Sequence, residues 1–456
     1  MDLDKFTIDV KKSIKDTLER IELNHHGLIF GIDDNQRVIG VATDGDIRRF
    51  LINGSNVNDL LLDCINTNFI WANRDTSRET LLKKIDNKIK LIPIIGTNGE
   101  LIDIVTKNSF PTQFEDNIYV RAKSPVRISF GGGGSDLTHY FVDQPGAVIN
   151  ATINIYSHAL LKPRFDEKII IHSSDLNQKI KVESLSELYN LKSDFSLVIS
   201  TIKAIQPDFG FELFLNSDFP MKSGLGGSAV VAATILGCFN HLRKDKFDNY
   251  ELSELAYQAE RIYQGISGGW QDQYATIFGG INFMEFNFDK NQVHPLRINN
   301  DLIYELEENL ILCYTGMNHE SGEIHDNQKE KMKEPNIKDL VRKNVKLTYQ
   351  MRDQLLRGKL LEFGNSLHDA WQLKKNFSNN ISNSNFDKLY DFAKANGAIG
   401  GKILGAGGGG YFLFYCSPYE KLNLVNALRE RGNEVRNFQF EGNGLTTWSI
   451  RENLAV

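Results

Sequence analysis

The stretch Pro220–Thr234 reads PMKSGLGGSAVVAAT and places three glycines and two serines directly before an apolar run. That run, AVVAATILGCFNHL, has the length and composition of a buried helix. A glycine turn at a helix start leaves several N–H groups unpaired, and together with the helix dipole they attract anionic oxygens. No Lys-Ser/Thr pair follows the last glycine at Walker A spacing. The stretch therefore predicts a phosphate-binding loop of another kind.

Two further glycine clusters accompany it. PVRISFGGGGSDLTHYF begins at Pro125, and GAIGGKILGAGGGGYFLFYC begins at Gly397. Glycines let the backbone approach a ligand closely, and a carboxylate such as Asp136 can accept hydrogen bonds from sugar hydroxyls. The glycine run after Pro125 is equally compatible with a simple turn. In the cluster that begins at Gly397, five of the six residues from Gly405 to Gly410 are glycine, which favours close approach to a ligand over a structural turn.

Two carboxylates lie between the second and third clusters, in AYQAERIYQGISGGWQDQYATIFGG. Glu260 falls near the end of an expected helix, and Asp272 follows beyond a glycine turn. Taken singly, Glu260 could pair with Arg261, Asp272 could cap a helix, and Ser228 could cap its own helix or reach a magnesium ion. Taken together with three glycine clusters, they suggest one acid for a metal and one for proton abstraction.

The first hundred residues contain an internal repeat at an offset of 106 − 43 = 63 residues. GLIFGIDDNQRVIGVATDGDIRRF and KLIPIIGTNGELIDIVTKNSF each read as strand, polar turn, strand and helix entry. The alternative is two unrelated hairpins. The repeat resembles a tandem CBS-type module, which implies an adenine nucleotide at Thr43 and Asp44. The second copy has Thr106 but Lys107, and the module could instead mediate homodimer formation.

Composition limits the class of protein. The 456 residues carry a net charge of −6, which gives no basic excess for nucleic acid or an anionic membrane. Four dispersed cysteines do not suggest a zinc site or a disulfide framework. The N-terminus lacks the apolar core of a signal peptide, and no run of 18 apolar residues occurs. The expected compartment is the cytoplasm.

Strands and helices alternate without a strict βαβ rhythm, so the expected fold class is α+β. A polar stretch with one proline, NSFPTQFEDN, separates the repeat from the rest of the chain. The expected domains are residues 1–110, 118–295 and 296–456.

The chain from about residue 118 to 456 resembles the GHMP kinases, because all three of their motifs occur here in order. The family pattern for the second motif is PxxxGLGSSAA, in which this chain has Gly227 for the first serine and keeps Ser228 as the second. The resemblance implies a two-lobed fold, with an N-lobe like ribosomal protein S5 domain 2 and a ferredoxin-like C-lobe. It also implies ATP and Mg²⁺ as the cofactors.

The resemblance implies specific roles. Asp272 would be the base, with Arg127 beside it, and Ser228 and Glu260 would hold Mg²⁺. Residues that would wrap the ATP phosphates are Lys222, Ser223, Gly224, Leu225, Gly226, Gly227, Ser228 and Ala229. Residues that would contact the substrate are Gly133, Ser135, Asp136, Gly407 and Gly408.

Within the family, VRISFGGGGSDLTHYF is most similar to the sugar-1-kinase branch of heptose 7-phosphate and L-fucose kinases. This implies ATP-dependent phosphorylation of the anomeric hydroxyl of a heptose 7-phosphate, for nucleotide-sugar and surface-polysaccharide synthesis. Alternatives are another sugar-1-kinase, of the L-fucose or galactose type, and a catalytically silent sugar or nucleotide sensor. The branch often has Arg-x-Ser where this chain has His319-Glu320-Ser321.

Overall fold

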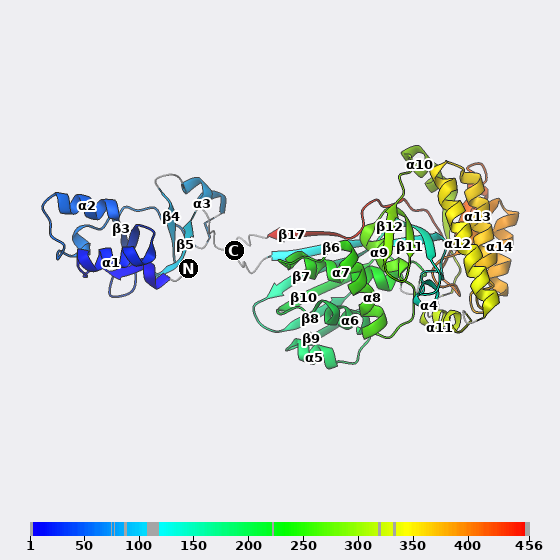
Figure 1. Ribbon diagram of the computed structural model, residues 1–456, viewed down its shortest axis with the longest axis horizontal. Helices are drawn as coiled ribbons and strands as arrows, with labels where there is room; N and C mark the ends of the chain where they lie inside the picture. Colours follow the sequence, from blue (N-terminus) through cyan, green and yellow to red (C-terminus); the bar gives the residue numbers. More distant parts are fainter. Residues whose placement is uncertain are drawn as a thin grey trace. The chain divides into compact units, whose positions relative to one another are not determined.

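The computed structural model divides into two compact units, residues 1–115 and 116–456 (Figure 1). It describes residues 3–73, 75–76, 78–85, 89–106, 118–220, 223–317, 321–331 and 334–451. Within these ranges, no helix is long and apolar enough to cross a membrane.

The first unit contains the two copies of the predicted repeat. Strands β2 and β3 form one antiparallel hairpin, and β4 and β5 form the other. Each hairpin has a register shift, between Gly31 and Ile32 in the first and between Ile94 and Ile95 in the second. These shifts lie 63 residues apart, as the repeat requires. The elements are η1 (Leu3–Phe6), β1 (Thr7–Asp9), α1 (Ile14–Asn24), β2 (Leu28–Ile32), β3 (Val38–Thr43), α2 (Asp44–Ile52), η2 (Leu61–Asp63), α3 (Arg78–Lys84), β4 (Leu91–Ile95) and β5 (Leu101–Thr106).

Side chains from both copies meet in one small apolar cluster. Phe6 and Phe30 belong to the first copy, and they pack with Leu91 and Ile104 of the second. Each copy also has its own cluster behind its hairpin. The two copies are therefore packed as a pair.

The larger unit is built on an eight-stranded sheet whose long strands are β6 (Ile118–Gly131) and β7 (Gly146–Arg164). These two strands pair antiparallel along most of their length. Helices α7 and α9 pack on β6 and β7, α12 also contacts both strands, and α13 contacts β6. The other elements here are α4 (Thr138–Phe141), β8 (Ile169–Ser173), β9 (Gln178–Val182), α5 (Leu185–Asn190), α6 (Ser196–Ile205), β10 (Gly210–Ser217), α7 (Gly227–Leu242), α8 (Asn249–Gln258), α9 (Gln271–Phe278), β11 (Ile281–Phe286) and β12 (Asn291–Pro295).

A second, four-stranded sheet has the order β14-β15-β13-β16 and is antiparallel throughout. Helix α13 packs on β14 and against α12, and Figure 1 shows α12, α13 and α14 at one end of this unit. Its elements are α10 (Asn300–Asn309), β13 (Leu310–Tyr314), α11 (Ser321–Lys331), α12 (Pro335–Leu356), α13 (Leu360–Lys374), α14 (Ser384–Ala395), β14 (Ala398–Ile403), β15 (Tyr411–Cys416), α15 (Lys421–Glu430) and β16 (Val435–Arg436).

The last strand does not join this second sheet. Strand β17 (Thr446–Arg451) pairs antiparallel with the segment 118–123 of β6. This strand falls within the expected domain 296–456, whereas its hydrogen bonds place it in the first sheet. Strand β17 thus joins the sheet in which the second expected domain begins.

Candidate active site

A cavity of about 320 Å³ opens in the larger unit. Residues of all three glycine clusters line it, together with both carboxylates that the sequence singled out. The predicted site residues in its wall are Arg127, Gly133, Asp136, Ser223, Gly224, Gly226, Gly227, Ser228, Ala229, Glu260 and Asp272. Residues far apart in the sequence therefore meet at one place.

The phosphate-binding loop ends where helix α7 begins at Gly227. Gly226 precedes the helix with a left-handed φ of 79°, and no side chain caps the helix start. The first intrahelical hydrogen bond runs from Val230 N to Gly226 O, so the N–H groups of residues 227–229 have no partner within the helix. Ser228 lies exposed in this first turn. The arrangement offers amides to an anion, as the sequence predicts.

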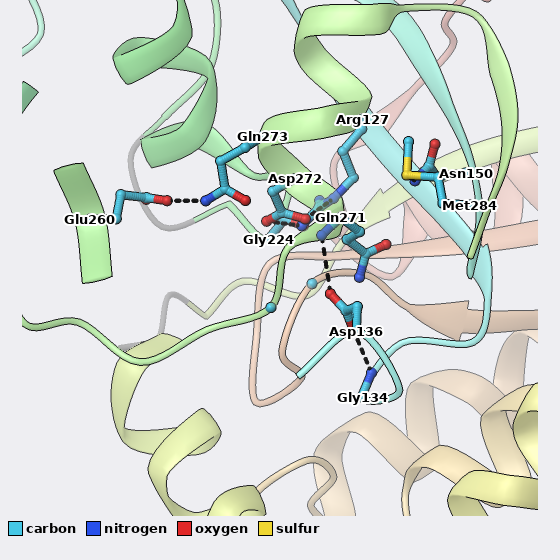
Figure 2. A network of polar contacts seen from close by, with 12 residues as sticks. Arg127, Gly134, Asp136, Asn150, Gly224, Glu260, Gln271, Asp272, Gln273 and Met284 are labelled. Atoms are coloured by element: carbon cyan, nitrogen blue, oxygen red, sulfur yellow. Dashed lines mark hydrogen bonds and ion pairs between the residues drawn. The ribbon is translucent and has the colours of Figure 1, made fainter. Parts of the chain in front are cut away.

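Arg127 joins this loop to the predicted base. Its Nε lies 2.7 Å from Asp272 Oδ1, and its Nη2 lies 2.6 Å from Oδ2. Its third nitrogen, Nη1, donates to Gly224 O at 2.8 Å. The Arg127 side chain is 3% exposed, whereas that of Asp272 is 24% exposed. Arg127 therefore fixes the carboxylate in a planar two-point contact while Asp272 still faces the cavity (Figure 2).

Glu260 lies in a π-helical turn, Ala259–Tyr263, which follows α8. Turns of this kind are rare and are often found at functional sites. Its carboxyl is buried, accepts a hydrogen bond from Gln273 Nε2, and lies 3.6 Å from Arg261 Nη2. Burial raises the pKa of Glu260, and the Arg261 guanidinium opposes that rise. Ser228 and Glu260 both line the cavity, and a cation bound there would favour the ionised carboxyl.

Asp136 is buried beneath the first glycine cluster. It accepts hydrogen bonds from Gly134 N at 3.0 Å and Gln271 N at 3.3 Å (Figure 2). Burial raises the pKa of Asp136, and the Asp272 carboxylate adds to that rise. The two backbone contacts fix the carboxyl at the cavity wall, where a sugar hydroxyl could reach it.

The third glycine cluster backs the phosphate loop. A Cβ on Gly405 would lie 2.8 Å from Gly224 O, and one on Gly410 would lie 2.3 Å from Ser223 O. Contacts this close require glycine. Gly405 and Ala406 reach the cavity wall.

Several predicted residues do not line the cavity. Gly407 and Gly408 pack instead on the segment at Ile381, where a Cβ on Gly407 would come within 2.7 Å of the Ile381 side chain. Leu225 is buried in the core, and the Ser135 hydroxyl is bound within its own loop, 2.7 Å from Gly132 O.

Three residues that the sequence singled out, Lys222, His319 and Glu320, lie outside the described residues.

Several residues of the cavity wall were not predicted from the sequence. Gln271, Gln328 and Lys374 line the cavity together with Asp136 and Asp272. Lys374 is the last residue of α13 and belongs to no motif, so no sequence pattern marks it. Apolar side chains also line the cavity, namely Leu176, Leu197, Val198, Leu215, Phe219 and Val231.

Comparison with known proteins decides the family. A curated heptose kinase from Campylobacter jejuni, "D-glycero-alpha-D-manno-heptose 7-phosphate kinase", is 36% identical over 337 residues, which span 73% of this chain and 99% of that protein. The chain belongs to the GHMP kinases. The family models for the GHMP kinase N-terminal and C-terminal domains match residues 196–280 and 351–434. The CBS domain model matches residues 1–53 and 57–110.

Solved structures agree with this GHMP kinase assignment. The structure named "D-glycero-D-manno-heptose 1-phosphate kinase", from Bacteroides thetaiotaomicron, is 30% identical with a TM-score of 0.60, and the match covers 73% of this chain and 100% of that one. Lactococcus lactis galactokinase, at 19% identity and a TM-score of 0.61, shares the fold over 72% of this chain and 95% of its own. The predicted α+β kinase fold and the predicted CBS pair are confirmed. This GHMP kinase is an ATP-dependent phosphotransferase with a sugar hydroxyl as its acceptor.

Proposed function

We propose that this kinase phosphorylates the anomeric hydroxyl of a heptose 7-phosphate of the D-glycero-D-manno type. The observation that carries this is the identity of 36% to a kinase named for that substrate, over nearly the full length of that relative. The product would be an activated sugar for nucleotide-sugar and surface-polysaccharide synthesis.

The cavity wall suits both substrates. Its apolar side chains match the adenine of ATP, and Asp136 and Gln271 match a polyol. The helix start at Gly227 also lines the cavity and offers amides to the phosphates. A bound ATP would thus present its γ-phosphate toward Asp272.

Phosphoryl transfer depends on position and charge neutralisation more than on covalent help. Asp272 would accept the proton of the acceptor hydroxyl, and Arg127 would hold that carboxylate in place through its two contacts. Ser228 and Glu260 would hold Mg²⁺, since one hydroxyl and one carboxylate are the hard oxygen ligands that it prefers. When bound, Mg²⁺ supplies neutralising charge at the β- and γ-phosphate oxygens.

A coupled ADP-release assay over a panel of sugars and sugar phosphates tests this function. We expect the highest kcat/KM with D-glycero-D-manno-heptose 7-phosphate. A preference for L-fucose or galactose would replace this assignment by another sugar-1-kinase. If the wild-type enzyme releases ADP no faster than Asp272→Asn with any acceptor, the protein is instead a silent sensor.

We also propose that the CBS pair binds an adenine nucleotide at Thr43 and Asp44. Asp44 is exposed at the start of α2, next to the end of β3. Its carboxylate is free to accept hydrogen bonds from ribose hydroxyls. The competing role for the pair is contact between two copies of the chain.

A further inference from the structure

Lys374 is a buried cation in the cavity wall. Only 5% of the residue is exposed, yet it lines the cavity. Its Nζ donates to Gly405 O of the third glycine cluster. In the part of the chain that the structure describes, no carboxylate forms an ion pair with it.

The arginines of the cavity wall, Arg127 and Arg261, differ from Lys374 because each has a carboxylate partner. Arg127 is paired with Asp272 at 2.6 Å, and Arg261 has Glu260 at 3.6 Å. Burying an ammonium without such a partner is costly. Burial and the charge of Arg127 together lower the pKa of Lys374 to about 8, although the charges of Asp136 and Asp272 oppose that shift. An incoming negative charge would offset this cost.

A second polar group lies beside the same open space. A Cβ on Gly133 would lie 4.0 Å from Lys374 Nζ and 3.8 Å from Gln271 Nε2. The Gln271 side-chain oxygen is buried and has no hydrogen-bond partner among the described residues, so the amide is free to turn toward a ligand. Two side chains that can donate hydrogen bonds through Nζ and Nε2, one of them charged, therefore flank Gly133 at the cavity wall.

We propose that Lys374, aided by Gln271, binds a phosphate oxygen of the substrates in the space beside Gly133. The proposal rests on the proposed kinase function and adds a residue that determines how a substrate is held. Phosphate is the fitting ligand because it brings the negative charge that Lys374 lacks and accepts several hydrogen bonds at once. That oxygen belongs either to the phosphate that the sugar already carries or to the phosphoryl group in transfer.

A purely structural role for Lys374 is the competing explanation, since its contact with Gly405 also holds a loop. Lys402 offers a matched comparison. It is buried to a similar degree and donates to Ser129 O at 2.6 Å, but it does not line the cavity. Burial lowers its pKa well below the usual value as well.

The test uses the full chain with the substitutions Lys374→Met, Lys374→Arg and Lys402→Met. Steady-state kinetics are measured with ATP and with D-glycero-D-manno-heptose, both as the 7-phosphate and without phosphate. We expect Lys374→Met to lower kcat/KM for the 7-phosphate roughly 10- to 100-fold, the usual value of a hydrogen bond to a charged group. Lys374→Arg should recover part of that loss, and Lys402→Met should change kcat/KM less than threefold.

The pattern of the loss identifies the source of the phosphate. If Lys374 binds the phosphate of the sugar, KM rises for the 7-phosphate alone, and calorimetry without nucleotide shows weaker binding of that sugar. If it binds the group in transfer, kcat falls equally with both sugars and the calorimetric affinity is unchanged. Either pattern supports the proposal.

Two results would overturn the inference while leaving the kinase function intact. One is that the Lys374→Met variant shows the same kcat and KM as an active wild-type enzyme. The other is an equal loss in Lys402→Met, which would assign both lysines to structure. Failure of the wild-type chain itself to phosphorylate any heptose would instead refute the proposed function.

Discussion

At the scale of single residues, Asp272 and Arg127 form the contact on which the chemistry depends. Replacing Asp272 by Asn keeps the size of the side chain but removes its ability to accept a proton. General-base catalysis usually contributes roughly 10²–10⁴-fold, so kcat of Asp272→Asn should fall by at least two decades. The KM for ATP should change little, because the loop amides and not Asp272 would hold the phosphates.

A substitution of Arg127 tests the same contact from its other side. Arg127→Lys keeps the charge but loses the planar two-point contact with Asp272. We expect it to retain less than a tenth of wild-type kcat, because the carboxylate is no longer fixed. If Asp272→Asn keeps the wild-type kcat, Asp272 is not the catalytic base.

Gly133 gives a second prediction at this scale. Its φ lies outside the left-handed region, so alanine fits the backbone without strain. The added Cβ would fill the space between Gln271 and Lys374. We expect Gly133→Ala to fold normally and to raise the KM for the sugar substrate about tenfold, measured in the ADP-release assay.

Gly442 is the matched control, since a Cβ there meets nothing within 4 Å and its φ is also ordinary. Gly442→Ala should leave KM unchanged. If Gly133→Ala also leaves KM unchanged, the sugar substrate does not occupy the space beside Gly133.

At the scale of elements, the start of α7 depends on the left-handed Gly226. Alanine there forces a side chain into positive φ, at a cost of about 1–2 kcal/mol. Its Cβ would also lie 3.2 Å from Arg127 Cζ and from Asp272 Oδ2. We expect Gly226→Ala to lower both the free energy of unfolding and kcat.

Gly432 separates these two effects because its φ is 91° and a Cβ there meets no atom within 4 Å. Gly432→Ala should lose a similar free energy of unfolding, measured by urea denaturation, with kcat unchanged. Equal kcat values for the two variants would mean that Gly226 contributes only to stability.

Local elements were predictable from the sequence because their causes are local. The glycine turn before α7 and the hairpins of the repeat are determined by neighbouring residues. The pairing of β17 with β6 and the π-helical turn at Glu260 were not predictable, since both depend on contacts between distant segments. Lys374 was missed for the same reason: only the packing of α13 brings it to the cavity, and no residue near it in the sequence marks it.

At the scale of the whole molecule, the chain joins a kinase to a CBS pair with its own apolar clusters. Thr43 caps α2 and exchanges hydrogen bonds with Asp46, so a change there would cost about 1 kcal/mol of stability. Asp44 takes no part in that cap. The substitution Asp44→Lys, which reproduces the Lys107 of the second copy, is therefore the cleaner test of the proposed nucleotide site.

We expect calorimetry of the full chain to detect one AMP that is lost in Asp44→Lys, because lysine cannot accept hydrogen bonds from ribose. Heat that persists in this variant would come from binding in the kinase cavity. If AMP changes kcat or KM in the wild-type enzyme but not in Asp44→Lys, the CBS pair regulates the kinase. If the two proteins give the same heat, the first copy has no nucleotide site, and sedimentation of the full chain should then reveal a dimer.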